Sequence, residues 1–105
     1  MVPSSTYWLY ADGEPVGFGK LRHFLTDKLR DEGGHAGYAI RTSERNKGYG
    51  TILLKMIIEE ARKMNIDKIL LTISINNANS IKVALNNKGK IERSNEVRHY
   101  IWIDC

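Results

Sequence analysis

The most constraining feature of this sequence is the apolar run ILLTISI at residues 69–75. A strand with apolar residues on both faces must be covered on both, which is typical of strands in sheets that helices flank. The preceding residues, from about Gly48, have the periodicity of an amphipathic helix. The predicted inner face of this helix carries Ile52, Leu53, Met56, Ile57 and Ala61. We expect Asn65 to end the helix in a left-handed conformation.

A strand is also predicted before this helix, at residues 35–41. Strand, helix and buried strand together indicate a right-handed crossover between parallel strands. Near the N-terminus we expect a hairpin, formed by a strand at residues 6–10, a turn at Asp12-Gly13 and a strand from residue 16, followed by an irregular loop with one helical turn at 24–30. A second helix is expected at 80–87, with its N-cap in the segment NNANS and its end at Lys88-Gly89. Two final strands are expected at 90–93 and 97–103. The fold class is mixed α/β, with a central mixed sheet and two main helices.

Length and composition limit the possible organisation of the chain. With 105 residues and 42% hydrophobic content, the sequence is expected to form one domain, residues 1–105. Lys and Arg number 16 against 12 Asp and Glu, so the formal charge of +4 favours anionic partners. No segment has the length of a membrane span or the order of a secretory signal, and we expect a cytoplasmic protein without membrane partners.

The metal-binding and redox residues are few. The single cysteine, Cys105, has no partner for an internal disulfide. The three histidines, His23, His35 and His99, lack the local spacing of a metal site, so no bound metal is predicted.

The entrance to the first long helix has the sequence RNKGYG, residues 45–50. The first amide groups of a helix have no partner within it, and the helix dipole adds positive charge there. Gly48 and Gly50 remove side chains where a phosphate would touch the backbone, while Arg45 and Lys47 add charge at the rim. The loop suits a pyrophosphate, but it lacks the Lys-Ser/Thr pair of an ATP loop and the third glycine of a dinucleotide loop.

These residues carry a resemblance to a known family. The loop matches the Arg/Gln-x-x-Gly-x-Gly/Ala signature of the GNAT (GCN5-related) N-acetyltransferases. Residues 34–38 (Gly-His-x-Gly-Tyr) and 77–83 (Asn-x-x-Ser-Ile-Lys-Val) resemble a bacterial group of that family, and the likeness extends from about Val16 to the end. It implies a GNAT-like acyl-CoA N-acyltransferase fold, shortened because the usual N-terminal strand and helices are lacking.

The resemblance also implies a cofactor and a set of residues that bind it. Acetyl-CoA would be the cosubstrate, with its pantetheine arm between splayed strands and its pyrophosphate on the signature loop. The residues implied are Tyr38, Ala39, Ile40, Arg41, Arg45, Asn46, Lys47, Gly48, Tyr49, Gly50, Thr51, Asn79 and Ser80.

The chemistry implied is direct transfer of an acetyl group to a primary amine of a small molecule or peptide. Such a transfer benefits from a base, an oxyanion donor and an acid for the thiolate. Many relatives have a tyrosine acid where this chain has Ala84, so the catalytic residues stay unassigned. Candidate acids are Tyr38, Tyr49 and Ser80, and candidate bases are His23, His35 and Glu44.

Two other classes of function remain open. Ala84 and the absent leading helices are compatible with a catalytically inactive CoA-binding or regulatory module. A basic nucleic-acid-binding domain is disfavoured, because acidic residues are mixed among the basic ones, so no nucleic-acid partner is expected. Strand edges exposed by the short N-terminus make a homo-oligomer a further hypothesis.

Overall fold

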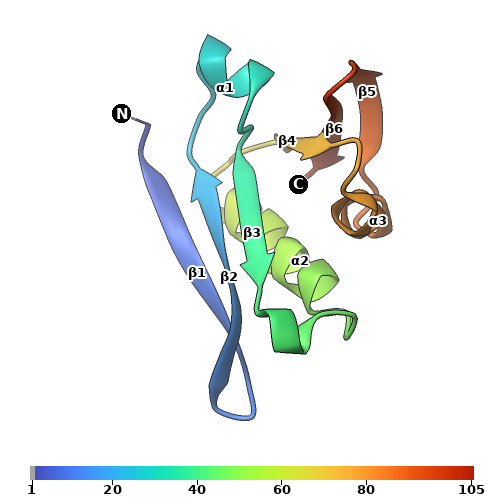
Figure 1. Ribbon diagram of the computed structural model, residues 1–105. Helices are drawn as coiled ribbons and strands as arrows, with labels where there is room; N and C mark the ends of the chain where they lie inside the picture. The colour runs from blue at the N-terminus through green and yellow to red at the C-terminus, as the bar shows by residue number, and fades with distance from the viewer. Residues whose placement is uncertain (1) are drawn as a thin grey trace.

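The structure, a computed structural model, describes residues 2–105. Two groups of strands lie on either side of the long helix α2 (Figure 1). Along the chain the elements are β1 (Ser4–Ala11), β2 (Glu14–Arg22), α1 (Asp27–Asp31), β3 (Ala36–Ile40), a 3-10 turn (Thr42–Glu44), α2 (Tyr49–Lys63), β4 (Lys68–Ser74), α3 (Ala78–Asn86), β5 (Lys90–Ser94) and β6 (Arg98–Asp104).

The predicted mixed α/β class is confirmed, but the strands of the described chain are divided between two antiparallel sheets. One sheet has the order β1-β2-β3 and the other β4-β6-β5. The sequence predicted that the crossover strands β3 and β4 lie in one mixed sheet. This prediction is wrong, because β3 and β4 belong to different sheets. They meet where the His35 N–H donates to the Leu70 carbonyl at 2.8 Å and the Leu70 N–H donates to His35 Nδ1 at 2.9 Å. An imidazole replaces a backbone acceptor at this point, and no ladder continues beyond it.

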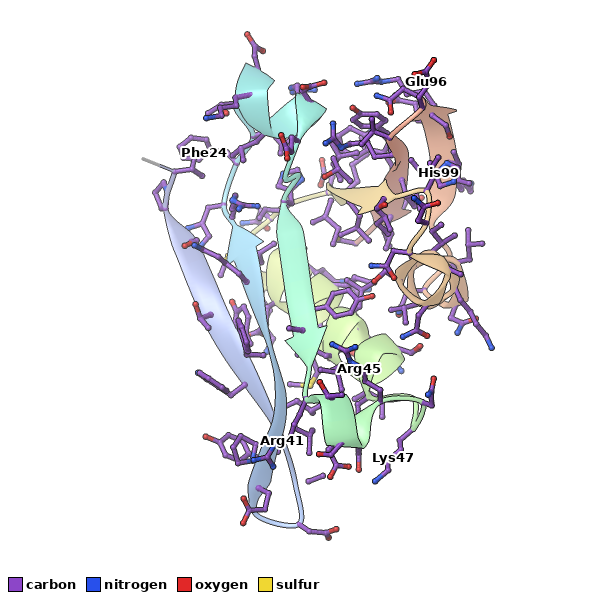
Figure 2. The ribbon with its side chains drawn as sticks, in the orientation of Figure 1. Phe24, Arg41, Arg45, Lys47, Glu96 and His99 are labelled. Atoms are coloured by element: carbon purple, nitrogen blue, oxygen red, sulfur yellow. The ribbon has the colours of Figure 1, made fainter. Side chains whose placement is uncertain are left out.

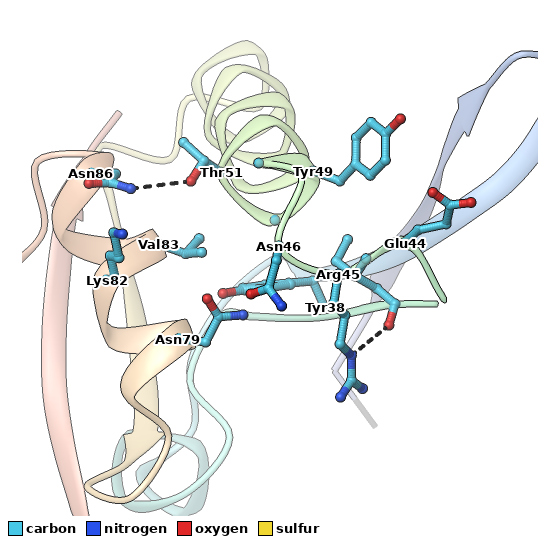
Figure 3. A pocket seen from close by; sticks show the side chains of 13 residues that line it. Tyr38, Glu44, Arg45, Asn46, Tyr49, Thr51, Asn79, Lys82, Val83 and Asn86 are labelled. Atoms are coloured by element: carbon cyan, nitrogen blue, oxygen red, sulfur yellow. Dashed lines mark hydrogen bonds between the residues drawn. The ribbon is translucent and has the colours of Figure 1, made fainter. Parts of the chain in front are cut away.

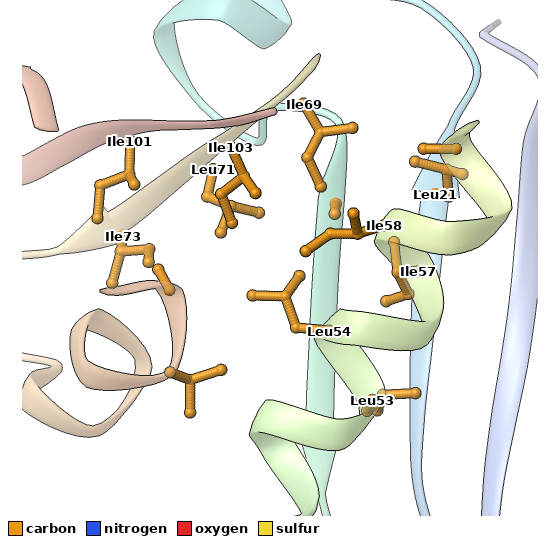
Figure 4. Packing of buried hydrophobic residues seen from close by; sticks show 14 residues of the cluster. Leu21, Leu53, Leu54, Ile57, Ile58, Ile69, Leu71, Ile73, Ile101 and Ile103 are labelled. Atoms are coloured by element: carbon orange, nitrogen blue, oxygen red, sulfur yellow. The ribbon is translucent and has the colours of Figure 1, made fainter. Parts of the chain in front are cut away.

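Helix α2 packs on both sheets, and its buried face therefore differs from the predicted one. Its buried residues are Leu53, Leu54, Ile57, Ile58 and Ala61. Figure 4 shows Leu53 and Ile57 directed towards β2, and Leu54 and Ile58 towards the β4–β6 side. A helix between two sheets needs a wider apolar stripe than a helix on one. Ile52, predicted to lie inside, is 48% exposed.

The ends of the two main helices lie close to the positions predicted from the sequence. Asn65 has φ 61°, the left-handed conformation predicted for it. Helix α3 begins two residues earlier than expected, because the side chain of Asn77 caps it by accepting from the Ser80 N–H at 3.2 Å. Ser80 is therefore inside the first turn and is not the N-cap. The predicted helix end is confirmed, since Lys88 has φ 66° and the Gly89 N–H donates to the Ala84 carbonyl. The single turn expected within residues 24–30 is α1.

Candidate functional site

A gap between β3 and β4 opens from their meeting point at His35 and Leu70. Its walls are Ala36 to Tyr38 on one side and Leu71 to Ser74 on the other, so both strands run in the same direction away from that point. The cavity in the gap has a volume of about 190 Å³. Its lining is completed by Asn77 and Ser80 at the start of α3.

The edge of β3 that faces this gap has free backbone groups. In the described chain β3 pairs with β2 only, and the Arg41 N–H donates to Val16 on that side. Backbone groups of successive residues alternate between the two edges of a strand. The N–H and C=O groups of Tyr38 and Ile40 therefore face β4, while those of Ala39 and Arg41 face β2. An extended ligand with amide groups suits such an edge.

A second cavity, of about 340 Å³, lies at the N-terminus of α2 (Figure 3). Gly48 is the N-cap, and no side chain caps the helix. Within residues 2–105, the amide groups of Tyr49, Gly50 and Thr51 make no hydrogen bond. The cavity is lined by Tyr38, Ile40, Glu44, Arg45, Asn46, Gly48, Tyr49, Gly50, Thr51, Asn79, Lys82, Val83 and Asn86. Unpaired amides and the helix dipole make this mouth suitable for an anion.

The charged side chains around this cavity leave a positive balance. The Arg45 Nε donates to the Ile40 carbonyl at 3.3 Å, which holds the guanidinium beside the end of β3. Glu44 also lines the cavity, but its carboxylate is 2.7 Å from Lys47 Nζ. This hydrogen bond to Glu44 raises the pKa of the Lys47 ammonium. The two opposite charges of the ion pair offset each other. Arg45 and Lys82 supply the remaining charge.

The two glycines of the signature loop serve different purposes. Gly48 has φ 82°, a conformation that other residues adopt only with strain, and a Cβ there would meet nothing within 4 Å. A Cβ on Gly50 would lie 3.2 Å from Val83 Cγ2 and 3.6 Å from the Tyr38 ring. Gly50 therefore allows α2, α3 and β3 to approach one another. That both glycines leave room for a phosphate stays a prediction, and Gly50 has this packing role in addition.

Tyr38 separates the two cavities and borders both. Its hydroxyl oxygen is buried and has no hydrogen-bond partner in the described chain. Burial raises the pKa of this phenol, and the neighbouring Ser80 side chain partly opposes that shift. Since no hydrogen bond of normal geometry joins Tyr38 to Ser80, burial dominates and the phenol is protonated at neutral pH.

Most of the residues expected at a cofactor site line the cavity at α2, but four do not. Side chains alternate along β3, so Ala39 and Arg41 point to the opposite face, where they line a groove with Trp8. Figure 2 shows Arg41 beside the β1–β2 hairpin and Lys47 directed outwards. Ser80 lines the gap between the strands instead.

Three lining residues on α3 were missed by the sequence reasoning: Lys82, Val83 and Asn86. With Asn79 they lie at spacings of three and four residues, which places them on one face of a helix. That periodicity was the available signal, because Asn79 was already expected at the site.

The candidate bases are all engaged in other interactions. His35 accepts the Leu70 N–H through Nδ1, and burial, followed by the charge of Arg30, lowers its pKa to about 4. His23 is 2.8 Å from the Ser5 hydroxyl and lines neither of the two cavities. Glu44 is paired with Lys47. Ala84, at the position where many relatives have a tyrosine, is fully buried in the core and lines neither cavity.

Residues 2–105 contain neither a cluster of metal-ligating side chains nor a helix that could span a membrane. Side chains of His, Cys, Asp and Glu in residues 2–105 do not gather in groups of three or more that would hold a metal ion. No helix in this range has the length and apolar composition needed to cross a bilayer.

Solved structures share the fold at low sequence identity. Salmonella typhimurium yncA, a putative acetyltransferase solved with acetyl-CoA, is 17% identical with a TM-score of 0.72 over 89% of this chain and 60% of its own. The GNAT domain of S. lividans PAT is 16% identical, with a TM-score of 0.81 over 99% and 62%. Thermoplasma acidophilum PaiA N-acetyltransferase, solved with coenzyme A, is 16% identical, with a TM-score of 0.77 over 97% and 61%. The chain thus spans about 60% of the length of each.

Sequence comparison gives the family. No curated protein matches the chain by sequence. The family model of the GNAT acetyltransferases matches residues 2–87, which is most of the chain, and the structural relatives have the same fold. The GNAT-like fold expected from the signature loop is therefore confirmed, and the chain belongs to the GNAT family of acetyltransferases.

Proposed function

We propose that the protein binds acetyl-CoA and transfers its acetyl group to a primary amine of a small molecule or peptide. The observation that carries the proposal is the adjacency of two sites: an anion-binding helix mouth and a gap with a free strand edge, joined at Tyr38. The diphosphate of coenzyme A matches the helix mouth, and its slender arm, which contains amide groups, matches the strand edge in the gap. Acetyl-CoA in yncA and coenzyme A in PaiA support the same choice.

The diphosphate is assigned to the mouth of α2. The amides of Tyr49, Gly50 and Thr51 donate to its oxygens, and Arg45 and Lys82 offset its charge. The pantetheine arm is assigned to the edge of β3, where Tyr38 offers an N–H and a C=O group. Gly48, Asn46 and Asn79 complete the wall of the site.

The reaction needs no covalent enzyme intermediate. The amine attacks the thioester carbonyl, and the oxyanion that forms is stabilised by a fixed N–H donor. The free edge of β3 supplies such donors. Since His35 and Glu44 are already paired, we assign the loss of the amine proton to water.

Calorimetric titration tests the cofactor assignment directly. We expect saturable binding of acetyl-CoA with one site per chain, and no binding of a short oligonucleotide of similar charge. A thiol-release assay over a panel of small primary amines and peptides with free N-termini then tests turnover. Absence of acetyl-CoA binding would reject the proposed function.

A second candidate function is a CoA-binding module without turnover. The specific observation in its favour is that the candidate bases His23, His35 and Glu44 are all hydrogen-bonded. Acetyl-CoA binding without thiol release for any amine would support the module. Amine-dependent thiol release would exclude it.

A further inference from the structure

The backbone of His35 is hydrogen-bonded to both sheets. Its N–H donates to the Leu70 carbonyl of β4 at 2.8 Å, while its C=O accepts from the Arg22 N–H of β2 at 2.7 Å. In a regular strand the N–H and C=O groups of one residue point to the same edge. His35 is therefore the junction of the two sheets, since from Ala36 onwards β3 pairs with β2 alone in the described chain.

The imidazole of His35 supplies an acceptor that the backbone around it does not. The carbonyls of Gly33 and Gly34 accept from Arg22 Nη1 at 3.2 and 3.1 Å. The His35 carbonyl is bonded to the N–H of the same arginine. Leu70 is buried, so its N–H needs a partner within the protein. Nδ1 of His35 is that partner, at 2.9 Å.

The gap between β3 and β4 opens directly after this junction. The last contact before it is the Gly33 N–H, which donates to Thr72 Oγ1 at 2.9 Å. Beyond it, residues 36–38 form one wall and residues 71–74 the other. Among residues 2–105, no backbone hydrogen bond joins these two walls. The distance between the walls therefore depends on the contacts at the junction, and the imidazole makes one of them.

We propose that His35 is a positioning residue for acetyl-CoA, because its imidazole holds β4 against the start of β3 and so fixes the width of the gap that receives the arm. The inference rests on the proposed function, since it requires acetyl-CoA in this gap. His35 lines neither cavity, so it acts through the strands and does not touch the ligand. A gap whose width is already fixed in the free protein binds an extended arm more tightly, because less ordering is required on binding.

The test compares two ligands that differ in the arm. ADP has the adenosine and the diphosphate of coenzyme A but no arm, so it reports on the mouth of α2. Acetyl-CoA and ADP are titrated calorimetrically into the wild type and His35→Ala, below the melting temperature of each protein. We expect His35→Ala to bind acetyl-CoA about tenfold more weakly and ADP with nearly unchanged affinity. A general loss of structure would weaken the binding of both ligands.

His35→Asn should restore the affinity for acetyl-CoA, because the Asn Oδ1 can accept the Leu70 N–H in place of Nδ1. His23→Gln is the matched control, since His23 is hydrogen-bonded to Ser5 and lines neither cavity. It should bind both ligands as the wild type does.

Arg22→Met is a second variant, which decides the question if His35→Ala does not fold. It removes the guanidinium that holds the Gly33 and Gly34 carbonyls, and it keeps the backbone N–H that donates to His35. Because the loop that carries the imidazole is then less firmly held, acetyl-CoA should bind about threefold more weakly and ADP as before.

Three results would overturn the inference: wild-type affinity for acetyl-CoA in His35→Ala, equal losses of affinity for both ligands in that variant, or no recovery in His35→Asn. If His35→Ala does not fold, wild-type affinities in Arg22→Met would overturn it. If acetyl-CoA does not bind the wild type, the proposed function fails as well. If acetyl-CoA and ADP bind the wild type but the variants keep its preference, only the role of His35 is wrong.

Discussion

His35 links the stability of this fold to pH. Its imidazole must be neutral, because Nδ1 accepts the Leu70 N–H and a protonated ring has no acceptor. Burial, and secondly the positive charge of Arg30, lower the pKa from the ordinary 6.5 to about 4. His35 also lies edge-on to Trp102, with ring centroids 6.4 Å apart, which adds to its shielding.

The sign and size of the effect follow from these two pKa values. Between pH 6.5 and pH 4 the unfolded chain binds a proton at His35 that the folded protein does not. The stabilising contribution of His35 is therefore fully present above the unfolded value and is lost progressively as the pH falls towards the folded value. From pH 7 to pH 5 the free energy of unfolding should fall by about 2 kcal/mol from this residue alone.

The experiment compares urea unfolding of the wild type and His35→Asn across that range. The Asn Oδ1 occupies the place of Nδ1, so it can still accept the Leu70 N–H but does not titrate. Between pH 7 and pH 5 we expect the free energy of unfolding to fall by about 2 kcal/mol more in the wild type than in His35→Asn. His23→Gln is the control and should follow the wild type. An equal pH dependence in His35→Asn would refute the reasoning.

Two further predictions concern the charge at the cavity and the approach of the strands. Lys82→Glu should weaken acetyl-CoA binding about tenfold at low ionic strength and less at high salt, whereas Lys28→Glu on α1 should leave the affinity nearly unchanged in the same titration. Gly34→Ala should lower the free energy of unfolding by roughly 3 kcal/mol or more, because φ is 61° and the new Cβ would clash with the backbone oxygen of Leu70. Gly13→Ala, also at positive φ but with open space around it, should cost only about 1–2 kcal/mol in the same denaturation assay.

The sequence predicted the local elements better than it predicted how they meet. Asn65 and Lys88-Gly89 end the two main helices as expected, because left-handed caps depend on a few adjacent residues. The contact between β3 and β4 depends on one side chain, His35, whose Nδ1 takes the place of a backbone acceptor for the Leu70 N–H. No periodicity reveals that substitution, since it joins residues far apart in the chain.

The same distinction applies to the candidate site. The N-terminus of α2 was predictable, because Gly48 and the loop before it lie next to the helix in sequence. Lys82 reaches the same cavity from α3, and its contribution depends on how α3 docks against α2 at Gly50 and Val83. Arg41 shows the converse, because a basic residue next to the signature loop points to the other face of β3.

The gap between β3 and β4 is closed at one end and open at the other, and separate residues serve these two ends. At the closed end, two hydrogen bonds between His35 and Leu70 hold the strands together. At the open end, the hydroxyl of Tyr38 is left without a partner in the described chain, at a cost on the order of 1–3 kcal/mol. Because the closed end depends on a neutral imidazole, acid that protonates His35 should remove the hydrogen bond from the Leu70 N–H and weaken the fold at that end.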